Sequence, residues 1–476
     1  MTHETMNFAG TKIVATISPK VGTVEMLRKF YESGMSVARL NTAHLDIETA
    51  EQLVDNIRQV SDRIAIMIDT KGPNIRTMNI ASPLEAEIGK TLIVSAHEVP
   101  GDKGFQVNFS KFVEEVSIGQ HIILGDGEVD LQIESRSNRE LVCRVITGGL
   151  VSDRKSVNVP GADLSMPALS QRDREFIDFA IRKNLSFIAH SFVRNRDDVM
   201  AVQSILDTAE SPIQIIAKIE NRQGVENLSS ILDVAHGIMV ARGDLGIEIP
   251  LEEVPLIQKK MIYECMRRCK PVITATQMLQ SMENSPLPTR AEVSDVANAV
   301  FDGTDAVMLS GETAQGNYPV EAVKMMTRIL RESEKGNLKL RSRIDDVAGE
   351  LLGAESAHLV KSAIDATERF PIKAIVCNTA TGRSSRMCAA FRCRVPIYAF
   401  SYNPVVVRQL ALSYGVVSFH TDFVEDWGSL SKNALQELMK LKLIEGDDQV
   451  VLLGRHSSTE QSVDFCSLIR PGEMSL

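Results

Sequence analysis

The fold of this chain follows from the stretch Ile213-Gln214-Ile215-Ile216-Ala217-Lys218-Ile219-Glu220. Its apolar run is too short for a helix and is rich in β-branched residues, so it predicts a buried strand. Lys218 and Glu220 are two residues apart at the end of the run, so in a strand both side chains project from the same face. A buried strand seldom carries charge there. The pair is therefore either an ordinary solvent-exposed strand end or part of a functional site.

Short apolar runs of this kind recur along the chain, with segments of helical spacing between them. Helices are predicted at residues 24–33, 173–183, 256–268 and 290–301, and Ser170 is a predicted N-cap. Alternating β and α units over eight strands predict an α/β fold, a parallel (β/α)₈ TIM barrel; an open eight-stranded sheet is the alternative. The predicted strands are residues 11–17, 37–41, 64–69, 187–192, 213–220, 237–242, 271–276 and 305–310.

The gap between the third and fourth strands is too long for a single helix. It contains turn signals such as Gly125-Asp126-Gly127 between short alternating runs, at residues 128–134 and 141–146, which predict a small β-rich domain. Inserted at the carboxyl end of a barrel strand, such a domain would act as a lid over the active face. The predicted domains are residues 1–71 and 166–345 for the barrel, 72–165 for the β-rich lid, and 346–476 for a C-terminal α/β domain.

Within the C-terminal domain, the pattern predicts a separate sheet. Helices are predicted at residues 354–370, 405–414 and 430–441, and strands at 374–377, 396–400, 449–453 and 462–469.

Composition limits the classes of function. The chain has 476 residues, enough for two or three domains, and its 62 acidic against 52 basic residues argue against nucleic-acid or membrane-surface binding. No apolar run reaches the length of a membrane span and the first ten residues are polar, so we expect a cytoplasmic protein. Seven scattered cysteines without a C-x-x-C pair predict reduced thiols and no zinc site.

Polar side chains gather at seven of the eight predicted strand ends. In a barrel these ends open on one face, where such folds keep their catalytic groups. Any single residue could be a helix cap or a rim salt bridge, but the set as a whole favours a functional site. The residues are Arg39 and Asn41; Asp69, Thr70, Lys71 and Arg76; Ser191 and Arg194; Lys218 and Glu220; Arg242 and Asp244; Thr276 and Gln277; and Ser310 and Glu312.

The charges in this set predict the ligands. Five cations around one rim, in a chain of net charge −10, suit a phosphate or carboxylate. Glu220 and Asp244 offer hard oxygen ligands for a divalent metal that keeps some water. Gly243 lets the backbone approach a ligand closely, and the amides at the start of a helix there would suit an anion.

Seven motifs, in order and at compatible spacing, resemble pyruvate kinase. The resemblance covers residues 11 to 330, reaches the inserted domain through residues 156–161, and is weaker beyond residue 355. The motifs are Thr11-Lys12-Ile13-Val14-Ala15-Thr16-Ile17, Val37-Ala38-Arg39-Leu40-Asn41, Asp69-Thr70-Lys71-Gly72-Pro73, Ile216-Ala217-Lys218-Ile219-Glu220-Asn221, Ala241-Arg242-Gly243-Asp244-Leu245-Gly246, Thr274-Ala275-Thr276-Gln277-Met278-Leu279 and Met308-Leu309-Ser310-Gly311-Glu312-Thr313.

The resemblance implies transfer of the phosphoryl group of phosphoenolpyruvate to ADP, giving pyruvate and ATP in the last step of glycolysis. It implies that Lys218 and Arg39 neutralise the phosphoryl group and that Glu220 and Asp244 hold Mg²⁺ or Mn²⁺. It further implies that Gly243, Asp244 and Thr276 bind the substrate carboxylate, and that the enolate receives its proton near Thr276 and Ser310. The residues it implies for nucleotide binding are Asn41, His44, Arg76 and Lys155. It also implies a homotetramer with contacts through the barrel and the C-terminal domain.

The chain departs from the family pattern at the site for a monovalent cation. The resemblance places that site at Asn41, Ala43, Asp69 and Thr70, but Ala43 has no side-chain oxygen. Asn74 stands where the family usually has Glu, and the Lys of members that dispense with the ion is absent too. We therefore hypothesise a weakened or absent requirement for K⁺.

A second departure concerns regulation. Residues 379–385, Thr-Ala-Thr-Gly-Arg-Ser-Ser, follow a predicted strand and precede a helix, as in a phosphate-binding loop or an ordinary connection. They resemble the loop that binds a sugar-phosphate effector in regulated members. Gly454-Arg455-His456-Ser457-Ser458 replaces the Gly-rich second effector loop, so the effector, a sugar phosphate or a nucleotide, would be different or missing.

Two other functions remain open at the sequence level. A lyase or aldolase could use the same metal-bound enolate, and a scaffold could keep the fold without catalysis. Lys218 and the inserted domain favour phosphoryl transfer, because a lyase needs neither a phosphoryl-neutralising cation nor a nucleotide-side domain. The intact set Lys218, Glu220, Asp244 and Thr276 argues against a scaffold.

Overall fold

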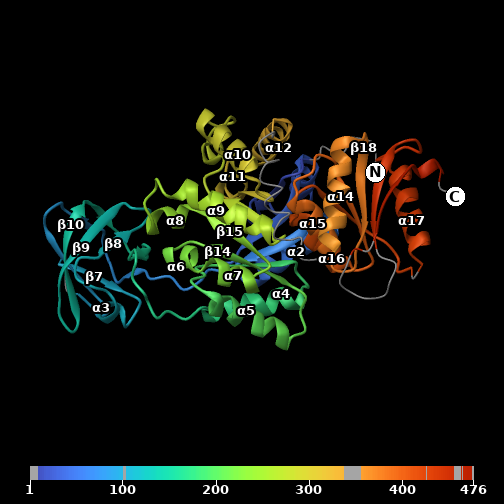
Figure 1. Ribbon diagram of the computed structural model, residues 1–476. Helices are drawn as coiled ribbons and strands as arrows, with labels where there is room; N and C mark the ends of the chain where they lie inside the picture. The colour runs from blue at the N-terminus through green and yellow to red at the C-terminus, as the bar shows by residue number, and fades with distance from the viewer. Residues whose placement is uncertain are drawn as a thin grey trace.

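Three bodies lie side by side in the computed structural model: an inserted sheet-rich domain, a central barrel and a C-terminal domain (Figure 1). The structure describes residues 9–99, 103–336, 355–424, 426–454, 463 and 465–473. All seven cysteines are free, as predicted.

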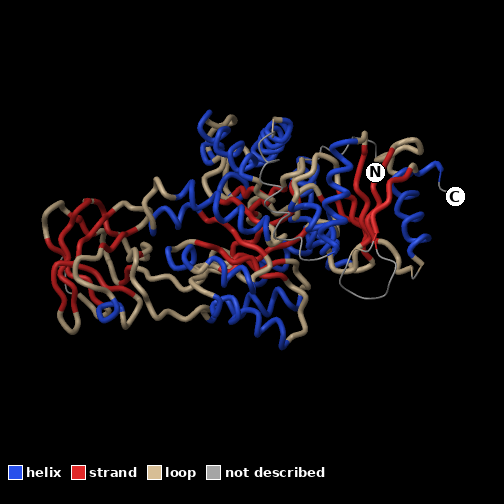
Figure 2. Tube along the Cα trace, in the orientation of Figure 1, coloured by secondary structure: helices blue, strands red, loops and turns tan. Residues whose placement is uncertain are grey.

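The central body is a closed barrel of eight parallel strands in the order β1-β17-β16-β15-β14-β13-β3-β2. Its closure confirms the predicted (β/α)₈ fold over an open sheet. Apolar side chains such as Val37, Ile216 and Met239 fill its interior, and the strands lie inside a ring of helices (Figure 2). The strands are β1 (Lys12–Thr16), β2 (Met35–Asn41), β3 (Ala65–Asp69), β13 (Phe187–His190), β14 (Gln214–Ile219), β15 (Gly237–Ala241), β16 (Val272–Ala275) and β17 (Ala306–Leu309).

The helices predicted at residues 24–33 and 290–301 begin where the sequence predicts, and those predicted at 173–183 and 256–268 begin two residues earlier. Ser170 caps the fourth helix: its Oγ accepts from the Asp173 amide at 3.2 Å, and the Asp173 carboxylate accepts from the Ser170 amide at 2.9 Å. The helices are α1 (Val24–Ser33), α2 (Ile47–Val60), α4 (Gln171–Arg182), α5 (Arg196–Thr208), α6 (Arg222–Glu226), α7 (Leu228–Val234), α8 (Arg242–Glu248), α9 (Val254–Arg267), η1 (Gln280–Glu283), α10 (Arg290–Asp302), α11 (Gly311–Ala314) and α12 (Pro319–Lys335).

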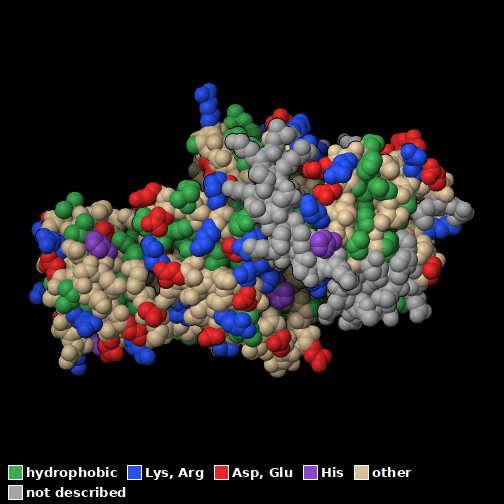
Figure 3. Space-filling view, viewed as in Figure 1, with side chains coloured by type: hydrophobic (Ala, Val, Ile, Leu, Met, Phe, Trp, Pro, Cys, Tyr) green, Lys and Arg blue, Asp and Glu red, His purple; other side chains and the backbone are tan. Residues whose placement is uncertain are grey.

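The inserted domain lies between β3 and α4 and is built mainly of strands. A seven-stranded sheet in the order β12-β8-β9-β10-β6-β7-β4 and a two-stranded sheet β11-β5 enclose their own apolar core. On the face seen in Figure 3, acidic and basic side chains are interspersed over this domain. The elements are β4 (Thr77–Met78), β5 (Leu84–Ala86), β6 (Thr91–Ser95), β7 (Gly104–Val107), α3 (Phe112–Glu115), β8 (His121–Leu124), β9 (Val129–Arg136), β10 (Glu140–Thr147), β11 (Gly149–Val151) and β12 (Val157–Asn158).

The C-terminal domain is a five-stranded α/β sheet in the order β20-β19-β18-β21-β22, with β22 antiparallel to β21. The sequence analysis missed β20, because Gly415, with φ of +70°, ends one segment and turns the chain straight into the strand. The elements are α14 (Glu355–Arg369), β18 (Ile372–Asn378), α15 (Arg383–Ala390), β19 (Ile397–Ser401), α16 (Pro404–Gln409), η2 (Leu410–Leu412), β20 (Val416–His420), α17 (Trp427–Lys440), β21 (Gln449–Gly454), β22 (Phe465–Ile469) and η3 (Pro471–Glu473).

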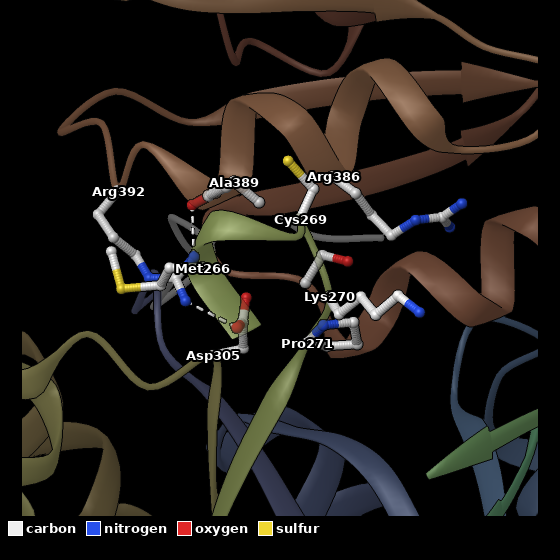
Figure 4. A pocket seen from close by; sticks show the side chains of 10 residues that line it. Met266, Cys269, Lys270, Pro271, Asp305, Arg386, Ala389 and Arg392 are labelled. Carbon is white, nitrogen blue, oxygen red and sulfur yellow. Dashed lines mark hydrogen bonds and ion pairs between the residues drawn. The ribbon is translucent and has the colours of Figure 1, made fainter. Parts of the chain in front are cut away.

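The C-terminal domain packs on the barrel through a buried ion pair. Arg392 donates to Asp305 at 2.7 Å and to the Ala389 carbonyl at 2.5 Å, and both charged side chains are almost fully buried. Figure 4 shows Arg392 reaching toward Asp305 beside a small pocket that Cys269 and Lys270 also line. Because Asp305 also accepts from the Tyr414 amide at 3.0 Å, this carboxylate joins the two domains twice.

Candidate active site

Lys218 lies at the centre of a buried charge network at the carboxyl end of the barrel. Its ammonium contacts Asp69 at 3.0 Å, Glu220 at 3.0 Å and the Ser191 hydroxyl at 2.7 Å, so side chains from three neighbouring strand ends meet there. Burial lowers the pKa of Lys218, but the Asp69 and Glu220 carboxylates outweigh it and hold that pKa above its ordinary value. Lys218 therefore stays charged across the physiological range.

Arg39 shares the Asp69 carboxylate with Lys218. Its Nε donates to Asp69 at 2.7 Å and its Nη1 to the Thr16 hydroxyl at 2.9 Å. Burial acts to raise the pKa of Asp69, but Arg39 and Lys218 keep it below its ordinary range. Two cations thus converge on one buried carboxylate, which positions both of them.

Glu220 lies on the other side of Lys218 and is almost fully buried. Its second oxygen accepts from the Phe192 amide at 2.7 Å, and Phe192 has φ of +56°, a conformation that a bulky residue seldom adopts. The pKa of Glu220 is raised, and Lys218 opposes this rise. Burial is the main cause of the rise, and the neighbouring Asp244 and Asp69 carboxylates add to it.

The turn after β16 is built around Thr276. Thr276 and Gln277 have φ of +68° and +53°, so two consecutive residues adopt the left-handed conformation. The Thr276 hydroxyl accepts from the Gly243 amide at 2.9 Å and donates to the Ala275 carbonyl at 2.7 Å. The Gly243 amide, which the sequence predicted to face the substrate, is thus bonded to Thr276 in this structure, while Asp244 is exposed.

Arg242 anchors this turn. Its guanidinium donates to the Thr276 carbonyl at 2.6 Å, to the Ala275 carbonyl at 3.2 Å and to Asp295 of α10 at 2.7 Å. The sequence analysis counted Arg242 among the rim cations for an anion, whereas the structure shows that it positions the β16 turn. Asp295 was missed, because nothing in the sequence links a helix residue to a strand end more than fifty positions away.

Ser310 and Glu312 close the opposite side of the same turn. Glu312 is buried, and its carboxylate accepts from the Ser310 amide at 2.7 Å and from the Leu279 amide at 3.0 Å. Burial raises the pKa of Glu312. This side chain ties the end of β17 to the segment that carries Thr276.

The four predicted nucleotide residues lie in two pairs. Asn41 ends β2 on the barrel and His44 follows it; Asn41 Oδ1 accepts from the Ala43 amide at 3.1 Å. Arg76 and Lys155 lie at the base of the inserted domain, where Arg76 donates to the Arg154 carbonyl at 2.7 Å. Lys155 forms an ion pair with Glu128, which the sequence analysis also missed.

The oxygens predicted for a monovalent cation have partners within the protein. Both Asp69 oxygens accept from cations, and the Thr70 hydroxyl accepts from the Ser191 amide at 3.0 Å. Ala43 contributes no side-chain oxygen. This arrangement does not fit a K⁺ ion held by four side-chain oxygens.

Cations and carboxylates converge at the strand ends of a parallel barrel, and a separate sheet-rich domain is joined to it. This combination is typical of a barrel enzyme that binds anions. Two family models match: "Pyruvate kinase, barrel domain" at residues 8–323 and "Pyruvate kinase, alpha/beta domain" at residues 357–469. The chain belongs to the pyruvate kinase family.

Individual relatives agree with this assignment. The chain is 44% identical over 409 residues to pyruvate kinase of Borreliella burgdorferi, covering 86% of this chain and 85% of the relative. It is 43% identical over 451 residues to pyruvate kinase of Geobacillus stearothermophilus, covering 93% and 77%. A crystal structure of a pyruvate kinase from Cryptosporidium parvum superposes with a TM-score of 0.92 at 35% identity, covering 97% of this chain and 96% of that one.

The protein is therefore a phosphotransferase that moves the phosphoryl group of phosphoenolpyruvate to ADP, and the lyase and scaffold alternatives fall away. Members of the family generally need a divalent metal ion and K⁺. No helix within the described ranges is both long and apolar enough to cross a membrane.

Proposed function

We propose that Lys218 and Arg39 carry the phosphoryl transfer in this chain. The observation that supports this most directly is their shared contact with the buried Asp69, at 3.0 Å and 2.7 Å. A phosphoryl group in transfer needs fixed positive charge aligned along its path. Asp69 fixes both cations before substrate arrives, so no rearrangement is needed during the reaction.

The residues present fit a divalent metal at Glu220 and Asp244. Three carboxylates, those of Asp69, Glu220 and Asp244, lie near Arg39 and Lys218. The pKa of Glu220 is raised mainly because its carboxylate is buried, and the Asp244 and Asp69 carboxylates add to the rise. A bound Mg²⁺ or Mn²⁺ would supply positive charge to the substrate phosphate and enolate oxygens. Among the described residues no three His, Cys, Asp or Glu side chains form a metal cluster, so substrate and water would complete the coordination.

The remaining roles follow the positions of the side chains. The Thr276 hydroxyl and the backbone amides of Gly243 and Asp244 hold the substrate carboxylate, once the Gly243 amide exchanges its bond to the Thr276 hydroxyl for one to substrate. Ser310 and Thr276 orient the solvent water that protonates the enolate carbon. Asn41 and His44 on the barrel, with Arg76 and Lys155 on the inserted domain acting as a lid, bind the nucleotide.

The geometry of the loop before α15 supports the proposal that this loop binds an effector, either a sugar phosphate or a nucleotide. Gly382 has φ of +80° and its amide donates to the Thr379 hydroxyl at 2.9 Å, while the buried Ser385 hydroxyl has no partner in the described part of the chain. Most of the second predicted loop, residues 455–458, lies outside the described residues.

A homotetramer is supported by two surfaces. Leu251 and Leu256 of the barrel are 73% and 70% exposed, and Leu287 is 62% exposed, so these apolar side chains are available for a contact between subunits. In the C-terminal domain, β22 is an edge strand open to pairing.

Metal titration tests the proposed site. Pyruvate formation, followed by coupling to lactate dehydrogenase, should require both ADP and Mg²⁺. Glu220→Gln should abolish Mn²⁺ binding measured by calorimetry without substrate. Glu312→Gln is a buried control after β17, which β16 and β15 separate from β14, and it should retain the binding. Mn²⁺ binding of ordinary affinity to Glu220→Gln would overturn the metal assignment.

A further inference from the structure

The ammonium of Lys155 is already neutralised within the inserted domain. It forms an ion pair with the Glu128 carboxylate, and the two side chains are 31% and 53% exposed. Glu128 is the one partner of this ammonium found in the described part of the chain. If Lys155 binds a nucleotide phosphate, its ammonium must therefore first break or share its ion pair with the Glu128 carboxylate.

Both members of the pair are held by backbone. The Lys155 amide donates to the Thr77 hydroxyl at 2.8 Å and its carbonyl accepts from the Thr77 amide at 2.9 Å, which fixes it to the strand that leaves the barrel. Glu128 ends the tight hairpin between β8 and β9 (Figure 1), where Leu124 pairs with Val129. The ion pair is therefore a contact between two turns whose backbone is fixed by hydrogen bonds.

Gly125 shows how closely the carboxylate is seated. A Cβ placed on Gly125, which has φ of +63°, would lie 2.8 Å from Glu128 Oε2. The carboxylate thus folds back over the hairpin toward Lys155. The Gly125 amide also donates to the Ser156 carbonyl at 3.0 Å, so the hairpin and the Lys155 segment are joined beside the ion pair.

We propose that Glu128 sets the affinity for ADP by occupying, on Lys155, the place that a phosphate oxygen of the nucleotide takes. Binding exchanges one anion for another at the same ammonium. Glu128 thereby keeps Lys155 oriented in the empty site and weakens nucleotide binding by competing for its charge. The inference rests on the proposed role of Lys155 on the nucleotide side.

The size of the effect follows from the exposure of the pair. Ion pairs that are about half exposed contribute little, so removing the competitor should lower the KM for ADP by about 1.4- to fivefold. Phosphoenolpyruvate does not contact Lys155 in this account, so its KM and kcat should stay unchanged.

A double-mutant cycle separates competition at Lys155 from general repulsion of an anionic nucleotide. Glu128→Gln should lower the KM for ADP in the wild-type chain and have no effect in the Lys155→Met background. General repulsion by the carboxylate would lower the KM equally in both backgrounds and would overturn the proposal. Glu134→Gln is the matched control, because it removes the 2.7 Å ion pair with Arg144 in the same domain and should leave the KM for ADP unchanged.

Salt provides a readout that a purely structural role would not move. In wild type, salt screens both the Lys155–Glu128 pair that breaks and the Lys155–phosphate pair that forms. In Glu128→Gln it screens only the Lys155–phosphate pair. The KM for ADP should therefore rise more steeply with salt in the variant, and equal slopes would count against the exchange.

The cycle also tests the role of Lys155 in nucleotide binding separately from the role of Glu128 as its competitor. If Lys155→Met leaves the KM for ADP at its wild-type value, the assignment of Lys155 fails and the inference falls with it. If Lys155→Met raises that KM while Glu128→Gln fails to lower it, the assignment stands and the role of Glu128 is refuted.

Discussion

At the scale of single residues, Asp69 organises the site. Its two oxygens orient Arg39 and Lys218, and its contact with the Ser191 hydroxyl at 3.2 Å adds a third strand end. The sequence placed Lys218 and Glu220 on one strand face, because side chains alternate with a period of two. It could not show that both cations share Asp69, since that contact depends on the closure of the barrel.

Potassium dependence is a prediction at this scale. Because Ala43 offers no side-chain oxygen and Asn74 stands where the family usually has Glu, turnover should be equal in potassium and in tetramethylammonium buffers. Ala43→Ser, which restores a side-chain oxygen, should make turnover more responsive to potassium. A large loss of wild-type activity on removing potassium would contradict this interpretation.

At the scale of elements, the turn after β16 is the part of the site that the sequence described least well. The resemblance to pyruvate kinase implied Thr276 as a ligand. Two consecutive left-handed residues, however, are a backbone feature without a clear sequence signal when neither is glycine. The Arg242–Asp295 pair that holds the turn joins the first residue of α8, directly after β15, to α10 and is a tertiary contact. Regular helices were predicted well because their caps and spacing are local.

Loss of the Arg242 anchor should disturb substrate binding. Arg242→Gln removes the ion pair and the bond to the Thr276 carbonyl, so the turn should relax and displace the Thr276 hydroxyl. A shift of about 1 Å there should lower kcat/KM for phosphoenolpyruvate by roughly 10- to 100-fold. Arg268→Gln, which breaks the exposed 2.6 Å pair with Asp233, is the control and should leave kcat/KM unchanged. Wild-type kinetics in Arg242→Gln would show that the turn holds its shape without the anchor.

At the scale of the whole molecule, the division into a barrel, a sheet-rich insertion and a C-terminal α/β sheet followed from counting βα units and from one overlong gap. The contact between barrel and C-terminal domain did not, because Asp305 and Arg392 lie far apart in the chain and each resembles an ordinary polar residue. Buried charges that join domains are visible only once the packing is known.

Two buried histidines predict acid sensitivity of the fold. Burial lowers the pKa of His190 and of His236 to about 4. Histidine has an ordinary pKa near 6.5, so between about pH 6.5 and 4 the unfolded chain binds protons that the folded chain does not. The stability that these neutral side chains contribute is complete above about pH 6.5 and is lost as the pH falls toward 4.

His190→Leu should flatten this profile. His190 is fully buried; burial lowers its pKa more than the nearby Asp198 and Asp173 carboxylates raise it. The melting temperature of the variant should therefore fall less than that of wild type between pH 7 and pH 5. Replacing the exposed His420 by Gln should leave the wild-type profile unchanged. Identical pH profiles for His190→Leu and wild type would refute the role of His190.

The central claim is that the Lys218 ammonium, oriented by Asp69, neutralises the phosphoryl group in transfer. The most direct test is the rate of ADP-dependent pyruvate formation in Lys218→Met, with circular dichroism and the melting temperature as checks on folding. Removing one preorganised charge should lower the rate by about 10³-fold, while Arg39 still pairs with Asp69 and the fold persists. A correctly folded Lys218→Met variant with near-normal turnover would contradict the account.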